Sequence, residues 1–109
     1  MATNKILFRG AVPTTAGSAE YTVPTGYRTI AREINICNTT TGALTVSIHF
    51  VAVGGSADTT NAIVYGQVVA PNGTLDLSGE HILTAGDFIQ VVGSASGLSM
   101  YASGEEVRL

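Results

Sequence analysis

The stretch Leu44-Thr-Val-Ser-Ile-His-Phe50 decides the fold class, because its side chains alternate between apolar and polar along the chain. An alternation with a period of two is typical of a β-strand, in which successive side chains point to opposite faces. One face of this segment is therefore expected to pack on a core, and the other to meet water or a partner. The apolar face consists of Leu44, Val46, Ile48 and Phe50, and the polar face of Thr45, Ser47 and His49.

A second long strand is predicted over residues 28–37, with an apolar face that Arg32 interrupts. Residues 38–43 are rich in turn formers and suit a hairpin with a Gly-containing loop. The strands at 28–37 and 44–50 are therefore predicted to pair. The second strand places Ile30, Ile34 and Ile36 on one face and Ala31, Glu33, Asn35 and Cys37 on the other.

The rest of the chain also consists of short strands between turns. Turn formers are clearest at Pro71-Asn-Gly73 and Ala85-Gly-Asp87, and no segment of ten or more residues has a helical period. The sequence therefore predicts an all-β protein, a single β-sandwich of about eight short antiparallel strands, with a jelly-roll or an Ig-like Greek-key topology. The further strands are expected at residues 5–9, 20–23, 62–69, 74–77, 88–92, 98–102 and 106–109.

Residues 1–109 are expected to form one domain. A chain of 109 residues, 45% of them hydrophobic, can fill one core and has too few apolar residues for a second. Within this domain, residues 1–19 are a candidate N-terminal arm. The tract Pro13-Thr-Thr-Ala-Gly-Ser-Ala19 would be loose unless a neighbour held it.

Ionised side chains are scarce, at 12% of the residues against roughly 25% in a typical domain. A surface with few charges is weakly protected against association, so part of it is expected to be buried against partners. The net charge is −3 and the five basic residues form no run, which argues against nucleic acid as a partner. These basic residues are Lys5, Arg9, Arg28, Arg32 and Arg108.

Cys37 is the only cysteine, so no intrachain disulfide can form and a secreted disulfide scaffold is excluded. A buried, inert thiol is expected at this position. The first nine residues contain only three consecutive apolar ones, too few for a signal-peptide core. No apolar run approaches the roughly 18 residues of a membrane helix, so we expect a protein made in a cytosol with no membrane partner.

No catalytic residue is predicted. His49 and His81 belong to the residue type that titrates near neutral pH, but neither lies in a metal-ligand or nucleophile motif. Both are interpreted as surface or interface residues, His49 on the polar face of its strand and His81 in a turn. Glu105 and Glu106 are adjacent, so in a strand they point to opposite faces and cannot act together on one bond.

No metal or cofactor site is predicted either. One Cys and two separated His cannot supply the four ligands of a structural zinc site. Residues 54–60 lack the Lys and the following helix of a phosphate-binding loop, and are interpreted as a flexible surface loop. Sugar binding usually relies on aromatic platforms, and the chain has no Trp. The remaining candidate sugar contacts are Tyr21, Tyr27, Tyr65 and Tyr101.

Four segments carry a family resemblance: Tyr21-Thr-Val-Pro-Thr-Gly-Tyr27, Ile34-Asn-Ile-Cys-Asn-Thr-Thr40, Leu83-Thr-Ala-Gly-Asp-Phe-Ile-Gln-Val91 and Ser103-Gly-Glu-Glu106. Together they resemble small virion proteins of tailed bacteriophages. In that group a Val-Pro-x-Gly turn, an Asn-ended strand, an Ala-Gly-Asp turn and a final Ser-Gly-x-Glu strand recur. The resemblance covers nearly the whole chain. It implies a β-sandwich built into the phage particle, as a capsid decoration or cement protein or as a neck, tail or fibre accessory, and it carries over no catalytic motif.

Composition and resemblance together predict a structural virion protein that binds and stabilises other particle subunits. Its expected partners are major capsid or neck and tail subunits, and its expected state is a homo-oligomer such as a trimer. The alternative is a tail or fibre accessory module that binds a host-surface glycan or protein. A small hydrolase would require His49 or His81 near a Ser or an acid inside a pocket, so no enzyme is expected. The expected location is the virion, after assembly in the host cytoplasm.

Overall fold

The computed structural model describes residues 2–109 and confirms an all-β fold, because this part of the chain contains strands and no helix. Strands β2 to β5 and β7 fall where the sequence predicted strands, and the strand predicted at residues 5–9 is half of β1. The eight strands are β1 (Ala2–Ala11), β2 (Tyr21–Thr22), β3 (Tyr27–Asn38), β4 (Leu44–Val51), β5 (Ala62–Val69), β6 (Thr74–Leu83), β7 (Phe88–Gly93) and β8 (Leu98–Arg108).

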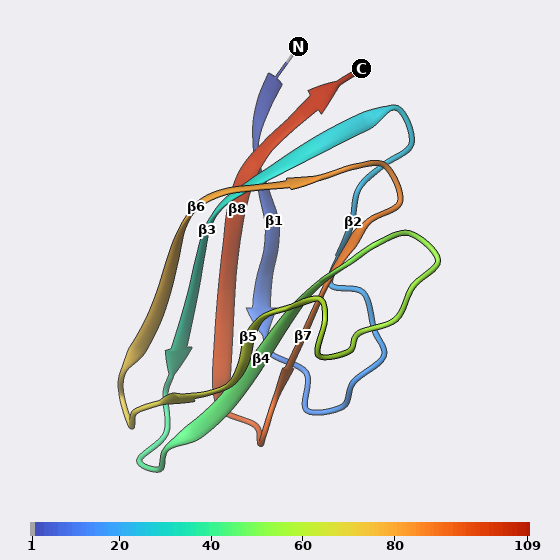
Figure 1. Cartoon of the computed structure of the whole chain (residues 1–109). Coiled ribbons are helices and arrows are strands. Elements are labelled where there is room, and N and C mark those ends of the chain that lie inside the picture. Colours follow the sequence, from blue (N-terminus) through green and yellow to red (C-terminus); the bar gives the residue numbers. More distant parts are fainter. Residues whose placement is uncertain (1) are drawn as a thin grey trace.

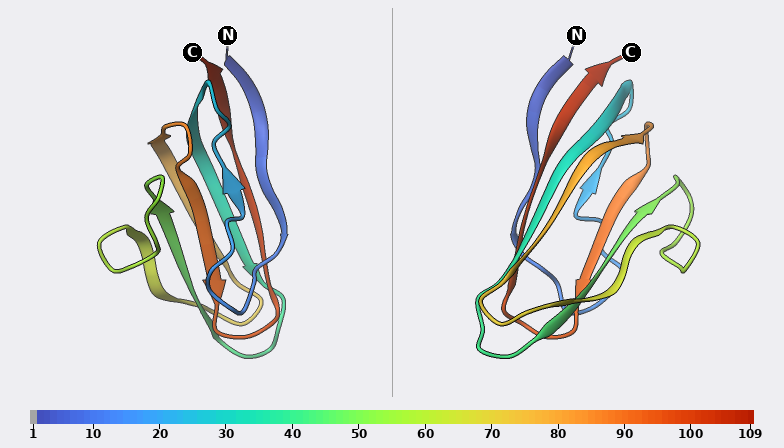
Figure 2. Two further views of the ribbon diagram at one scale, coloured as in Figure 1. Left: turned by 90° about the vertical axis from the view of Figure 1, so that its right-hand side faces the viewer. Right: turned by 60° about the vertical axis from the view of Figure 1, so that its left-hand side comes forward.

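The strands form two packed four-stranded antiparallel sheets (Figures 1 and 2). Sheet A has the order β1-β8-β3-β6, and sheet B has the order β2-β7-β4-β5. Each strand of the first half of the chain pairs with its mirror-image strand of the second half: β1 with β8, β2 with β7, β3 with β6 and β4 with β5. Two packed sheets ordered in this way form a jelly roll, so the jelly-roll alternative holds and the Ig-like one does not.

The predicted hairpin between residues 28–37 and 44–50 is wrong. β3 lies in sheet A and β4 in sheet B, so residues 39–43 cross from one sheet to the other. The buried Asn38 side chain fixes this crossing: its Nδ2 donates to Gly42 O at 2.8 Å and to Val69 O at 3.0 Å, and its Oδ1 accepts from Thr40 N at 2.9 Å. Turn-forming residues suit a crossing between sheets as well as a hairpin, so the sequence pattern did not distinguish these two connections.

A row of irregularities crosses sheet A at one level. Both neighbours of β8 have a register shift near Ser103 and Gly104. On β1 the shift lies between Ile6 and Phe8, and on β3 it lies between Ala31 and Glu33. The second shift also involves β6, where His81 pairs with Ala31 and Ser78 with Glu33. Each extra residue bends its strand and increases the local twist of the sheet.

The predicted faces of β3 are partly wrong, because a bulge at Arg32 changes which residues point inward. Before it Ala31 is buried, and after it Ile34 and Ile36 are buried, so the inward face changes from odd to even numbers. Ile30 is only partly buried and does not share the face of Ile34 as predicted. One extra residue in a strand reverses the alternation, and no residue type announces such a bulge.

Two more strand boundaries differ from the predictions. The strands expected at 98–102 and 106–109 are one continuous strand, β8, because Gly104 continues the ladder and does not end it. β6 extends past residue 77 to Leu83, so His81 lies in a strand and not in a turn. The turn after it is confirmed, with Asp87 N donating to Thr84 O at 2.9 Å.

The core lies between the sheets and takes side chains from both. The predicted inner face of β4 is confirmed, because Val46 and Ile48 are buried and Phe50 packs on the same core. Each fully buried Val or Ile stabilises the fold by about 1.5–3 kcal/mol relative to an exposed one. The largest of the fully buried apolar side chains in this core are Val23, Ile34, Ile36, Val46, Ile48, Val69, Ile89 and Val91.

Most of the candidate arm, residues 1–19, lies in the sandwich. Residues 2–11 form β1, which pairs with β8 from Ala2 opposite Val107 to Ala11 opposite Ser99. Residue 1 lies outside the described residues. The chain ends therefore meet at one end of the molecule (Figure 1). Contact between this segment and a neighbour stays a prediction, and deleting residues 2–12 would remove an edge strand as well as an arm.

Candidate functional site

Edge strand β5 of sheet B exposes large apolar side chains. Tyr65 is 68% exposed, Val68 56% and Ile63 36%. β5 lies in a run, residues 59–75, that contains no Asp, Glu, Lys or Arg. An exposed apolar strand with unpaired backbone groups is a surface that favours pairing or packing with another chain.

The other sheet edges are protected in ways that β5 is not. β1 carries Lys5 and Arg9, β6 carries Asp76 and Glu80, and β2 is only two residues long. Charged side chains and short length are the usual devices that prevent one edge from joining another. β5 has neither charge nor short length, and only two bulges opposite Ile48 and a kink at Gly66, with φ of 60°, make it irregular.

The charges of the chain are segregated away from this edge. Between Ile34 and Leu75 the only Asp, Glu, Lys or Arg is Asp58. Its carboxylate is engaged within its own loop, where Oδ1 accepts from Thr60 N at 2.8 Å and from Thr60 Oγ1. The side-chain hydrogen bond from Thr60, and then the backbone one, hold the pKa of Asp58 below its usual range. The β4–β5 side of the molecule is thus almost uncharged.

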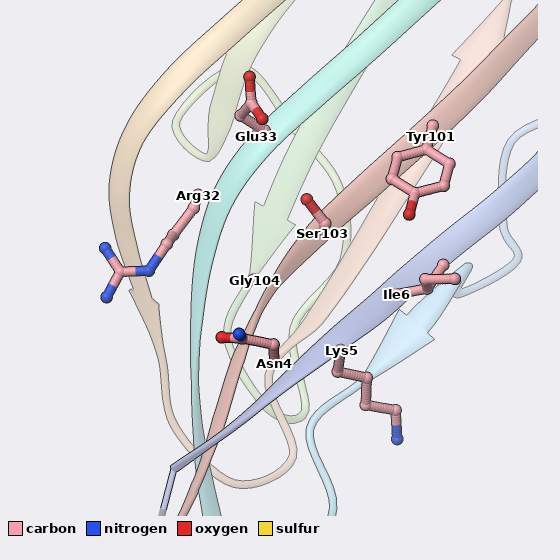
Figure 3. Close-up of a pocket in the computed structure, with 8 residues that line it drawn as sticks. All are labelled: Asn4, Lys5, Ile6, Arg32, Glu33, Tyr101, Ser103 and Gly104. Carbon is pink, nitrogen blue, oxygen red and sulfur yellow. The ribbon is translucent and has the colours of Figure 1, made fainter.

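A shallow depression of about 350 Å³ lies on the outer face of sheet A, over β1, β3 and β8 (Figure 3). Gly104 leaves its floor without a side chain, and the Arg32 side chain extends away from Ser103. The depression combines one aromatic ring with polar groups of both charges. Its lining consists of Asn4, Lys5, Ile6, Arg32, Glu33, Tyr101, Ser103 and Gly104.

Both cations in this lining are already paired. Arg32 Nε donates to Glu105 Oε1 at 2.9 Å, and Arg32 Nη1 lies 2.9 Å from Glu80 Oε1. Lys5 Nζ lies 3.2 Å from Glu106 Oε2. An anionic ligand would have to break one of these pairs, so the depression is poorly suited to phosphate or carboxylate groups.

A buried polar cluster links the two sheets near the chain ends. The Tyr21 hydroxyl donates to Glu106 Oε2 at 2.5 Å and lies 2.7 Å from Thr29 Oγ1. Burial, and next the hydrogen bond to Glu106, raise the pKa of Tyr21 above its usual range. Glu105 bonds to Arg32 on the outer face, which confirms that the two adjacent acids point to opposite faces. Tyr21, Thr29 and Glu106 line neither the depression on sheet A nor the one on sheet B, so we interpret the cluster as a structural link between the sheets.

The interpretation of His49 as a surface residue is wrong. His49 lies on the outer face of sheet B as predicted, opposite Gln90, but it is only 6% exposed. Residues 52–61 fold over it, and Nδ1 lies 2.9 Å from Asn61 Oδ1. Residues 54–60 form a mostly exposed loop, as predicted, and Asn61 holds one side of it, since Asn61 Nδ2 also donates to Ser56 O at 2.9 Å.

The remaining candidate residues are scattered. His81 points inward and meets Phe50 edge-on at 5.2 Å between ring centroids, away from His49. Cys37 is half-buried, not fully buried as predicted. Tyr65 on β5 and Tyr101 on β8 are exposed in different sheets, and Tyr21 is buried, so they form no common aromatic platform. Within residues 2–109 no three His, Cys, Asp or Glu residues are grouped to hold a metal ion.

The uncharged edge β5 was missed at the level of sequence. The signal that could have found it is the run 59–75, but the sequence did not tell whether that run forms a central strand or an edge. No helix in the described part of the chain has the length and apolarity needed to cross a membrane. Comparison with protein-family models gives no match, and comparison with curated proteins gives none.

Proposed function

We propose that this protein is a structural subunit of a tailed-bacteriophage virion, of the capsid decoration or cement type, that binds other particle subunits through β5. The observation that carries the proposal is the exposure of Ile63, Tyr65 and Val68 on the one sheet edge without charge or shortening. The family resemblance of the four turn and strand segments supports the assignment to a phage particle. Its partners are major capsid or neck and tail subunits, and further copies of the chain.

The mechanism is burial of apolar surface together with strand-edge hydrogen bonds. Removing apolar surface from water contributes roughly 25 cal/mol per Å². The backbone groups on the free side of β5 can pair with a strand of the partner, which fixes the register of the contact. An uncharged edge forms such a contact without desolvating ion pairs, which is costly. The protein is assembled into the virion in the host cytoplasm and acts there without catalysis.

Val68→Lys tests this proposal, because it places a charge on the apolar edge at an exposed position, without touching the core. Sedimentation velocity over a range of concentrations should show oligomers of the natural chain and monomers of the variant. Ile82→Lys is the matched control, since Ile82 is equally exposed but lies on sheet A. The same proteins are then sedimented with capsids and with tails of the phage.

Loss of both oligomers and particle binding in Val68→Lys, with neither lost in Ile82→Lys, is the expected result. A natural chain that stays monomeric at every concentration and pellets with neither capsids nor tails would refute the proposal. Binding to tails together with binding to a host-surface glycan would instead favour the accessory-module alternative.

A further inference from the structure

Two loops cover the outer face of sheet B and leave a crevice of about 430 Å³ between them. The loops are residues 12–20 and 52–61, which lie on the same side of the molecule in Figure 1. The floor of the crevice is the outer face of β7, from which Phe88 and Gln90 project. Its walls consist of Ala16, Gly17, Ala19, Gly55, Ser56 and Ala57.

The Gln90 side chain is the polar group that the fold leaves unused. Gln90 is only 7% exposed, yet its amide makes no hydrogen bond with any other residue of the range 2–109. It is not among the fully enclosed polar atoms that lack a partner, so the amide opens onto the crevice that Gln90 lines. A nearly buried amide needs a partner, because leaving its donors and acceptor unpaired is costly.

The neighbouring polar groups direct their hydrogen bonds to other residues and not to Gln90. Glu20 Oε2 accepts from Val91 N at 2.9 Å, and its Oε1 accepts from Ser18 Oγ at 2.7 Å. His49, opposite Gln90 on β4, is bound to Asn61. The amide of Gln90 is therefore free to bind a molecule that enters from solvent.

The lining limits what that molecule can be. None of the residues that line the crevice is ionised, so it offers no counter-charge to a phosphate, a carboxylate or an ammonium group. A purely apolar ligand would leave the Gln90 amide unpaired. The ligand that fits is neutral, has both donors and acceptors on its edge, and has an apolar face to lie against Phe88.

We propose that the crevice binds a neutral pyranose unit of a glycan. The ring C–H face would lie on Phe88, and adjacent hydroxyls would exchange hydrogen bonds with the Gln90 amide, which offers two donors and an acceptor. The small wall residues allow the loop backbones to approach a ring closely. Residues 52–61 are fixed in advance by Asn61, so little order is lost on binding. This goes beyond docking through β5 and does not depend on it.

The test is a two-dimensional amide NMR titration of the full chain with glucose, galactose, mannose and N-acetylglucosamine, each raised through the millimolar range. At least one sugar should produce saturable shifts confined to residues 16–19, 55–57 and 88–90. Gln90→Met, which keeps the length of the side chain but not the amide, should raise the Kd about tenfold or more, since one desolvated hydrogen-bonding group is lost. Ala16 is an exposed residue in the wall of the crevice, so the large side chain of Ala16→Trp should occupy the crevice and abolish the shifts.

Tyr101→Ala is the control and should leave the sugar shifts unchanged, because Tyr101 is exposed on β8 of sheet A and does not line the crevice. Saturable shifts that survive both Gln90→Met and Ala16→Trp would overturn the proposal, as would the absence of saturable shifts with all four sugars. Shifts in the crevice produced by a neutral peptide and by none of the sugars would also overturn it, and would assign the crevice to a protein partner. Sugar binding that persists in Val68→Lys would separate this site from the docking edge.

Discussion

The Tyr21 hydroxyl on β2 donates a 2.5 Å hydrogen bond to Glu106 Oε2 on β8, so one sheet is bonded to the other through a buried carboxylate. Lys5 completes the arrangement, with Nζ at 3.2 Å from the same oxygen. A buried charge is tolerated only when it is paired and hydrogen-bonded. Tyr21 therefore stabilises the fold through its hydroxyl group as well as through its apolar ring.

Tyr21→Phe should lower the free energy of unfolding at neutral pH by about 1–3 kcal/mol, because Glu106 loses a buried hydrogen-bond donor. The natural chain should also lose stability in alkali. The pKa of Tyr21 is raised in the folded state, so its contribution is complete below the unfolded pKa of about 10 and is lost as the pH rises above that value. Urea unfolding from about pH 8 to about pH 11 should show a flatter profile for the variant. Parallel profiles would contradict this.

Gly104→Ala should destabilise the protein strongly, because a Cβ at this position would overlap the carbonyl oxygen of Ile30 and lie 3.0 Å from Ala31 Cα. Backbone groups cannot move aside as a flexible side chain can, so we expect a loss of about 3 kcal/mol or more. Gly42→Ala is the control, since nothing lies within 4 Å of a Cβ there. Thermal unfolding of the two variants measures the difference, and equal melting temperatures would exclude this close approach.

Asp87→Asn should weaken the turn before β7 and reduce the acid sensitivity of the fold. Burial raises the pKa of Asp87, but hydrogen bonds from Thr84 and from Val53 N outweigh it and leave the pKa below its usual value. The contribution of Asp87 is therefore present above about pH 4 and is lost as the pH falls through the folded pKa. Melting temperatures at neutral pH should fall in the variant, and the further fall in acid should be smaller than in the natural chain. An equal or larger further fall in the variant would argue against this role.

Asn61→Ala should release residues 52–61 from the outer face of sheet B. Its side chain bonds to His49 Nδ1, to Asp58 N at 3.0 Å and to Ser56 O. Losing these bonds should cost about 1–2 kcal/mol and raise amide hydrogen exchange in the loop. Thr59→Ala, at an exposed position of the same loop, is the control. Unchanged exchange in Asn61→Ala would mean that packing alone holds the loop.

The fold class was readable from local patterns, but its topology was not. The alternation from Leu44 to Phe50 predicted the inner face of β4 correctly, because that strand pairs with β7 without a register shift. The bulge at Arg32 reversed the faces of β3, and bulges depend on how neighbouring strands fit. The crossing at Asn38 looked like a hairpin, because the same turn formers serve both purposes.

The candidate sites were even harder to predict than the topology, because they are formed by residues that are far apart in the sequence. The scarcity of charge was visible in the sequence and predicted a docking surface, but only the sheet order identifies β5 as the uncharged edge. Gln90 belongs to an alternating strand and gave no signal of its own. Its burial comes from residues 12–20 and 52–61, which are far from it in sequence.

The mirror-image pairing of the strands has a consequence for biosynthesis. The hairpin-like pair β4–β5 is the earliest that can close, because its members are adjacent in the chain. Strand β1 finds its only partner in β8, so it must wait until residues 99–107 have left the ribosome. Distant pairings of this kind make folding slow. During that interval the nascent chain exposes unpaired apolar strands, and we expect chaperones to be needed while it does.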